Sequence, residues 1–206
     1  MPDSSSATPP PATPDQALER LVIGNQRFRS GDSAPRDEQA EVATTSAAQQ
    51  PFATVLACVD SRVTPQRIFD QGLGDIVGVR VAGNTVSDAV LASLEFACEA
   101  LGTPCLVVLG HTRCGAVARV TEGGQVGHQP GPTDKLRRAV DATSSVDGGA
   151  SAHDEFTDEV ARKNVELTVA DIRDESPVLA ALEQQGGLLI TGALYDVATG
   201  AVVFLP

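Results

Sequence analysis

The stretch TVLACVDSR, residues 54–62, joins a short apolar run to a group of chemically reactive side chains. A second stretch, LVVLGHTRC at residues 106–114, repeats this arrangement further along the chain. Both apolar runs are short and rich in β-branched residues, as buried strands are, and helix-like sequence follows each of them. The two stretches therefore predict strand-to-helix turns. In an α/β sheet such turns meet at the carboxyl edge of the strands, where these folds bind ligands.

Cys58, His111 and Cys114 are the candidate metal ligands in the two turns. Two thiolates and one imidazole form a soft ligand set that suits Zn²⁺. Three protein ligands leave the fourth tetrahedral position open, which is typical of a catalytic rather than a structural zinc site. A His-x-x-Cys spacing alone arises by chance, but its combination with Cys58-x-Asp60-Ser61-Arg62 after another strand is far more specific.

The two motifs, Cys58-x-Asp60-Ser61-Arg62 and His111-x-x-Cys114-Gly115, resemble those of the β-class carbonic anhydrases. Weaker similarities extend over nearly all of the chain except its N-terminal tail; they are Gln49-x-Pro51, Arg80-x-Ala82-Gly83-Asn84, Ser93-Leu94-Glu95-Phe96 and Gly192-x-x-Tyr195-Asp196. The resemblance implies a lyase, carbonate dehydratase, in which zinc-bound hydroxide reversibly hydrates carbon dioxide to bicarbonate. It also implies a homodimer or homotetramer whose pocket residues are shared across subunits.

Asp60 and Arg62 are the catalytic residues that the resemblance implies. In the family, the Asp that pairs with this Arg accepts a hydrogen bond from the zinc-bound hydroxide and orients it. In some members the same Asp leaves the Arg and closes the zinc site as a fourth ligand at lower pH. Asp60 could bind either cation, so both states are open here. A purely structural ion pair is the simpler alternative for these two residues.

Gln49, Val77 and Phe96 are the substrate-binding candidates, assigned by aligning the spacing of the family's motifs. Gln49 matches a Gln that donates a hydrogen bond to the substrate oxygen. Val77 stands where many members carry Phe, and Phe96 stands where many carry Tyr. Both departures keep the pocket apolar, which suits a nonpolar gas, but they remove an aromatic ring and a hydroxyl. Arg80 matches a recurrent Arg of the family.

Two other functions fit the same motifs. The first is a catalytically silent or regulatory zinc-binding protein on this scaffold, with Asp60 as a permanent fourth ligand. The ring lost at Val77 makes that function conceivable. The second is a hydrolase of a related small electrophile such as carbon disulfide, which would differ in the access tunnel rather than in the motifs.

Length and composition favour one domain. Residues 13–206 are expected to form a single catalytic domain, because a chain of 206 residues can bury a substantial core. Residues 1–12 are rich in Ser, Pro and Ala and are expected to form a disordered tail. Cys98 and Cys105 are interpreted as buried free thiols that act as small hydrophobes.

The net charge of −12 argues against nucleic acid or an anionic membrane surface as a partner. No segment approaches the length of a membrane span, and the N-terminus has no basic region followed by an apolar run. We therefore expect a cytoplasmic protein.

Hydrophobic periodicity and turn residues predict an α/β fold with a mostly parallel central sheet, flanking helices and a C-terminal edge hairpin. Strands are expected at residues 52–57, 76–81, 105–109, 188–194 and 201–205. Helices are expected from Thr13 onward and at residues 37–49, 65–71, 87–101, 114–123, 133–140, 154–173 and 177–185.

Overall fold

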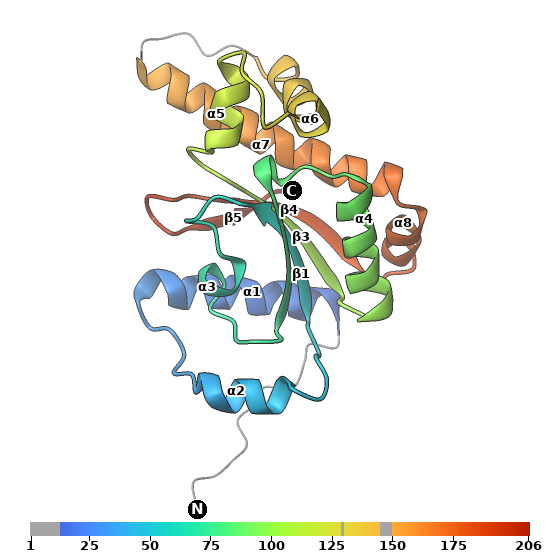
Figure 1. The fold of residues 1–206 in the computed structure, drawn as a ribbon. Coiled ribbons are helices and arrows are strands. Elements are labelled where there is room, and N and C mark those ends of the chain that lie inside the picture. Colours follow the sequence, from blue (N-terminus) through green and yellow to red (C-terminus); the bar gives the residue numbers. More distant parts are fainter. Residues whose placement is uncertain (1–12, 129, 145–149) are drawn as a thin grey trace, which may run out of the picture.

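The computed structural model describes residues 13–128, 130–144 and 150–206. Within them a five-stranded sheet has the order β2-β1-β3-β4-β5, with helices on both of its faces (Figure 1). Its strands are β1 (Ala53–Cys58), β2 (Ile76–Val81), β3 (Cys105–His111), β4 (Leu189–Tyr195) and β5 (Val202–Phe204). All neighbouring strands are parallel except β4 and β5, which form an antiparallel pair. The predicted α/β class, mostly parallel sheet and edge hairpin are therefore confirmed.

The helices follow the predicted segments closely. They are α1 (Pro14–Ser30), α2 (Glu38–Thr45), α3 (Pro65–Ile68), α4 (Asp88–Glu95), α5 (Gly115–Thr121), α6 (Pro130–Asp141), α7 (Ala150–Glu175) and α8 (Pro177–Gln184). A 3₁₀ turn, η1 (Ala82–Asn84), follows β2, and a π-helical turn, η2 (Phe96–Ala100), continues α4. The predicted tail at residues 1–12 lies outside the described residues.

The start of α1 shows how the sequence sets a helix boundary. The Thr13 side chain accepts a hydrogen bond from the backbone N–H of Gln16, and Pro14 occupies the first helical position. Threonine at the cap satisfies a backbone donor that has no partner inside the helix, and proline has no such donor to satisfy. The helix start predicted from these residues is confirmed.

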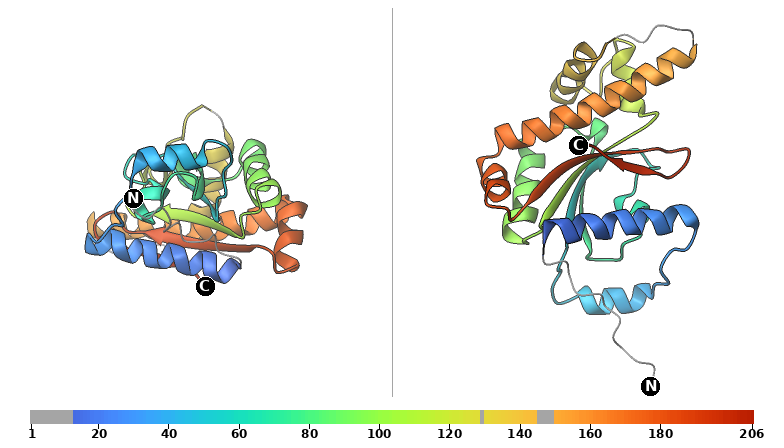
Figure 2. Two further views of the ribbon diagram at one scale, coloured as in Figure 1. Left: turned by 90° about the horizontal axis from the view of Figure 1, so that it is seen from below. Right: turned by 180° about the vertical axis from the view of Figure 1, so that it is seen from behind.

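Helices cover both faces of the sheet (Figure 2), and an apolar cluster lies between the helices and the sheet on each face. On one face α1 and α3 pack against the strands, and the buried side chains there include Leu21, Phe52, Val55, Ile68 and Phe69. On the other face α4, α7 and α8 supply a second cluster, which includes Leu94, Val165, Ile172, Leu179 and Ile190. A third cluster, formed by α5, α6 and α7, lies around Cys58 and Cys114 at the carboxyl edge of the strands.

Two strand glycines allow α7 to lie close to the sheet. A Cβ atom added at Gly110 of β3 would come within 2.4 Å of Val165 Cγ2, and one added at Gly192 of β4 within 2.6 Å of Val165 Cγ1. Only glycine avoids these overlaps, because no other residue lacks a Cβ atom. Val165 thus fixes the distance between α7 and the two strands.

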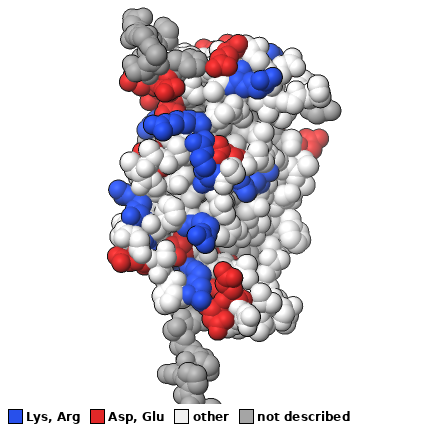
Figure 3. Space-filling model, turned by 60° about the vertical axis from the view of Figure 1, so that its left-hand side comes forward, with Lys and Arg blue, Asp and Glu red and all other residues white. Residues whose placement is uncertain are grey.

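The outer surface carries charges of both signs. On the visible part of the face in Figure 3, Lys and Arg side chains lie among Asp and Glu side chains. None of the described helices combines the length and the apolar character that crossing a membrane requires.

A buried carboxylate, Asp70, ties the segment that joins α1 and α2 to the end of α3. Its carboxylate accepts hydrogen bonds from Arg27, from Arg36 and from the backbone N–H of Ala34. Burial raises the pKa of Asp70, but these hydrogen bonds outweigh that effect, so the pKa lies below its usual value. The negative charge of Asp70 therefore stabilises the fold.

We predict that Asp70→Asn lowers the free energy of unfolding by about 2 kcal/mol at neutral pH, because Arg27 loses its anionic partner and Arg36 keeps only its pair with Glu41. Asp70 has a positive φ of 46°, which asparagine tolerates, so the substitution isolates the charge. Urea denaturation at several pH values measures the effect. The contribution of a group whose folded-state pKa is lowered is complete above its unfolded pKa, about 3.9 for Asp, and is lost as the pH falls through the folded-state value.

Asp32→Asn is the matched control, because Asp32 is an exposed acid in the same segment. The difference between Asp70→Asn and wild type should stay constant near neutral pH and shrink below about pH 4. A difference that grew on acidification would contradict the assigned role of Asp70.

Candidate metal centre

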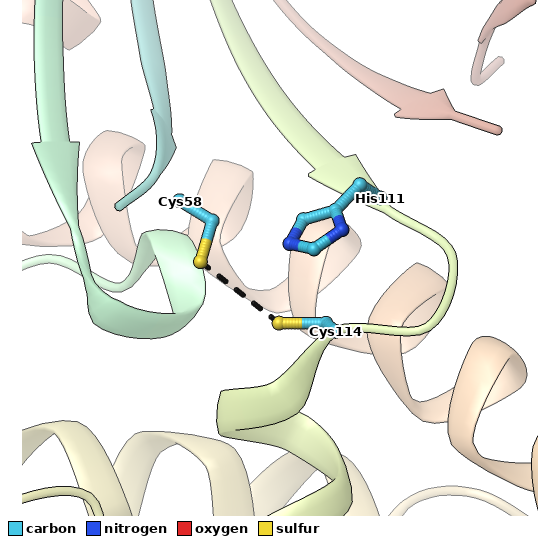
Figure 4. A group of neighbouring side chains, drawn as sticks. All are labelled: Cys58, His111 and Cys114. Carbon is cyan, nitrogen blue, oxygen red and sulfur yellow. Dashed lines mark hydrogen bonds between the residues drawn. The ribbon is translucent and has the colours of Figure 1, made fainter. Parts of the chain in front are cut away.

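Cys58, His111 and Cys114 converge at the carboxyl edge of the sheet. Cys58 ends β1, His111 ends β3, and Cys114 caps the start of α5. Each residue offers one ligand atom, and these three atoms lie within 4.8 Å of one another (Figure 4). The side chains are almost fully buried, with 3%, 0% and 1% of their residues' surface exposed. The structure therefore places close together the three residues that the sequence predicts as metal ligands.

His111 is arranged to bind a metal ion through one defined nitrogen. Its Nδ1 atom lies 2.9 Å from the backbone oxygen of Thr112, so Nδ1 carries the proton and donates it to that carbonyl. Its Nε2 atom is buried, and nothing among the described residues forms a hydrogen bond with it. A buried imidazole nitrogen without a partner is costly unless it has a ligand. The orientation of the ring therefore fits a metal ligand.

The two thiols share a hydrogen bond, with 4.0 Å between their sulfur atoms. The hydrogen bond with Cys114 lowers the pKa of Cys58, and the backbone N–H groups of Asp60 and Gly83 lower it further against the opposing effect of burial. The same hydrogen bond, together with burial, raises the pKa of Cys114. The pair therefore loses its first proton from Cys58. Two sulfurs and one nitrogen in this arrangement match the donor set of zinc sites that keep an open fourth position.

Asp60 and Arg62 form a bidentate ion pair beside the cluster. Arg62 Nε lies 2.9 Å from Asp60 Oδ1, and Arg62 Nη2 lies 2.8 Å from Asp60 Oδ2. The hydrogen bonds from Arg62 lower the pKa of Asp60 to about 2. Arg62 Nη2 also donates to the backbone oxygen of Arg113, at 3.1 Å. The guanidinium thus links the turn that carries Cys58 to the turn that carries His111 and Cys114.

Arg80 of β2 holds the first of these turns through its backbone. Its guanidinium donates to the carbonyl oxygen of Cys58, at 3.0 Å, and to that of Asp60, at 2.7 Å. Two donors of one planar group fix both carbonyls together. The contacts give Arg80 a positioning role that its sequence context alone did not indicate.

The second turn is also held by contacts that sequence reasoning missed. The backbone N–H of Thr112 donates to the carbonyl of Tyr195, and the Thr112 hydroxyl accepts from the backbone N–H of Val197. The backbone N–H of Arg113 donates to the carboxylate of Asp158, which lies on α7. No local pattern could have revealed these partners, because they depend on which strand and helix neighbour β3.

Val77 and Gln49 lie away from the metal ligands of their own chain. Val77 pairs with Thr54, four residues before Cys58, which corresponds to about 13 Å along the strand. Gln49 precedes the start of β1, where Phe52 bonds to Asp75 at the amino edge of the sheet. The structure therefore does not bring either residue to the metal ligands within one chain.

Phe96 also lies toward the amino edge of the sheet. It follows α4, and the next residue, Ala97, accepts a hydrogen bond from Thr103, whose hydroxyl contacts Thr54. The Phe96 ring is an unusually exposed apolar side chain, with 58% of its residue surface open. It too is separated from the metal ligands of its own chain.

Comparison with known proteins identifies the family of this chain. Residues 53–202 match the family model described as "Carbonic anhydrase". The chain belongs to the β-class carbonic anhydrase family. It is 37% identical over 195 residues to "Carbonic anhydrase" of Mycolicibacterium smegmatis and 36% identical over 196 residues to "Carbonic anhydrase 2" of Mycobacterium tuberculosis. Each alignment covers 94% of both proteins.

A solved structure shares both the fold and the family. The β-carbonic anhydrase of Coccomyxa, in complex with acetazolamide, superposes with a TM-score of 0.69 at 27% sequence identity. The match covers 91% of this chain and 86% of that one. The resemblance inferred from the two motifs is therefore confirmed.

We predict that wild-type protein binds about one Zn²⁺ per chain and that Cys58→Ser and Cys114→Ser each abolish tight binding, since each removes one of three ligands. Elemental analysis after dialysis against a weak chelator measures the content. Loss of zinc should also lower the melting temperature, because a metal ion that binds only the folded chain stabilises it.

Cys98→Ser is the matched control, because Cys98 is also a buried free cysteine but contacts Thr103 instead of the cluster. It should retain the zinc content of the wild type. Full zinc content in Cys58→Ser would contradict the assignment of the ligands.

Proposed function

We propose that this chain catalyses the reversible hydration of carbon dioxide to bicarbonate, with residues 13–206 as one catalytic domain. The observation that carries the proposal is the buried Cys58–His111–Cys114 cluster, in which His111 Nε2 has no hydrogen-bond partner among the described residues, with an ionised Asp60 two residues after Cys58. Membership of the β-class carbonic anhydrase family supports the same reaction.

The residues that would hold Zn²⁺ are Cys58 through Sγ, His111 through Nε2 and Cys114 through Sγ. When bound, Zn²⁺ acts as a Lewis acid that lowers the pKa of water and so supplies a nucleophile near neutral pH. Two thiolates donate more charge than imidazoles would, so a nucleophile is expected to form toward the alkaline side of neutrality.

Asp60 would orient the attacking water by accepting a hydrogen bond from it. Because Arg62 lowers the pKa of Asp60 to about 2, the side chain remains a carboxylate throughout the neutral range and can only accept. Arg62 acts as a positioning residue, since its two hydrogen bonds fix both carboxylate oxygens. The attack adds water across one C=O bond of carbon dioxide. It yields bicarbonate and one proton, which must then leave the site.

The ion pair between Asp60 and Arg62 also helps to distinguish between the alternative functions. A silent zinc-binding protein would need Asp60 as a ligand, yet both of its carboxylate oxygens already accept hydrogen bonds from Arg62. The ion pair therefore favours the enzyme. A hydrolase of carbon disulfide would use the same residues, and no contact described above favours that substrate.

We further propose that a second copy of the chain completes the pocket. Gln49, Val77 and Phe96 are the substrate-binding candidates, and within one chain they lie toward the edge of the sheet opposite the metal ligands. A homodimer or a homotetramer could bring them to the metal centre of the neighbouring subunit. The exposure of Phe96 supports this assembly, because a large apolar side chain gains from burial at an interface.

We predict that Asp60→Ala lowers the rate of carbon dioxide hydration by about 10²-fold or more, because the attacking water loses its acceptor. Stopped-flow hydration assays from pH 6.5 to 9, on protein of measured zinc content, test this. The zinc content should equal that of the wild type, since the three ligands remain.

Asp134→Ala is the control, because Asp134 is an exposed acid on α6 that forms a surface ion pair with Arg137. It should hydrate carbon dioxide at the wild-type rate. A fully zinc-loaded Asp60→Ala variant with wild-type activity would remove Asp60 from the mechanism, and an inactive wild type with full zinc would overturn the enzyme itself.

We predict that Gln49→Ala and Asp60→Ala chains complement each other. A hybrid dimer would hold one intact site, composed of Asp60 from the first chain and Gln49 from the second. Co-expression should restore about a quarter of the wild-type rate, since half of randomly paired C₂ dimers are hybrids with one good site each. If Gln49 acts within its own chain, both sites of the hybrid are defective and no activity returns.

A further inference from the structure

Arg113, between the ligands His111 and Cys114, has a backbone conformation that needs support. Its φ angle is +53°, in the left-handed region that non-glycine residues rarely occupy. Such a conformation is energetically unfavourable and persists only where the surroundings impose it. The turn that presents Cys114 therefore depends on contacts from outside itself.

Asp158 of α7 supplies such a contact. Its Oδ1 atom accepts a hydrogen bond of 2.7 Å from the backbone N–H of Arg113. Partial burial raises the pKa of Asp158, and nearby Asp154 and Asp196 add to that effect, so a carboxylate at this position is not favoured by its general surroundings. The hydrogen bond from the Arg113 N–H and the positive charge of Arg113 are the interactions that favour the carboxylate.

The helix that carries Asp158 is held firmly against the sheet. Val165 lies seven residues further along α7, on the same face as Asp158, and packs directly on Gly110 just before His111. Beside it, the buried side chain of Asn164 donates to the carbonyl oxygen of Gly83, at 2.8 Å. The position of Asp158 relative to the ligand turn is thus fixed from a rigid element.

The peptide groups of Arg113 connect this contact to Asp60. The N–H of Arg113 is held by Asp158, while its carbonyl oxygen accepts from Arg62 Nη2, which also donates to Asp60 Oδ2. Rotation of the Arg113 backbone would move that carbonyl away from Arg62. It would thereby disturb the ion pair that orients Asp60.

We propose that Asp158 is a positioning residue of the active site, which clamps the left-handed turn at Arg113 and through it sets the geometry of Cys114 and of the Arg62–Asp60 pair. The role requires a hydrogen-bond acceptor at Oδ1 rather than a negative charge. The part of this inference that concerns catalysis rests on the proposed function. The part that concerns the ligand turn does not.

The test compares Asp158→Leu, which removes the acceptor, with Asp158→Asn, which keeps a carbonyl oxygen of the same reach. In Asp158→Leu we expect amide hydrogen exchange in the peptide that spans residues 111–115 to accelerate about tenfold or more, since the loss of such a bond in a strained turn is worth about that factor. We also expect zinc to pass faster to a chromophoric chelator and kcat per bound zinc to fall. Asp158→Asn should restore most of all three properties.

Glu155→Leu is the matched control, because Glu155 is an exposed acid on the same helix. Asp158→Ala serves in place of Asp158→Leu if the larger side chain prevents folding. Wild-type exchange and zinc release in the acceptor-less variant would overturn the proposal. An asparagine variant as defective as the leucine variant would overturn it too. Because exchange and zinc release need no turnover, they remain informative even if the chain does not hydrate carbon dioxide.

Discussion

The parallel pairing of β1 with β3 is the constraint on which the metal centre depends. Ala57 pairs with Leu109, so the residues that follow on both strands reach the same edge of the sheet together. Cys58 and His111 are far apart in the sequence, yet this register makes them neighbours. Parallel strands with both faces covered are among the most rigid elements of a fold, which suits ligands that must keep a fixed separation.

Around this edge, the backbone does most of the positioning. Arg80 binds two carbonyls of the first turn, Arg62 binds a carbonyl of the second, and Thr112 anchors that turn to the end of β4. These contacts give several polar backbone groups near the centre a defined partner, which keeps the turns in one conformation. A ligand set can be tight only if its supports are rigid, and here the supports come from β2, β4 and α7.

The sequence was sufficient to predict the class of the fold and the three residues that form the Cys58–His111–Cys114 cluster. Those features are encoded locally, in apolar runs, in the Thr13 cap and in two short motifs. It could not reveal the order of the strands, nor that Asp158 would reach Arg113, because these depend on how distant segments pack. The sequence likewise could not show that the helix predicted at residues 87–101 is divided into α4 and a π-helical turn. Nor could spacing alone show that Gln49, Val77 and Phe96 lie away from the metal ligands of their own chain.

Gly110 and Gly192 have a consequence for engineering this scaffold. Replacing a strand glycine by alanine or a β-branched residue is a common route to higher thermal stability, because it reduces the entropy of the unfolded chain. At these two positions the added carbon would push against Val165 and lift α7 from the sheet. The residues of α7 that form hydrogen bonds with neighbouring turns would then move away from their partners. A consensus or directed-evolution library should therefore leave both glycines unchanged and seek its gains on the outer faces of α1 and α8.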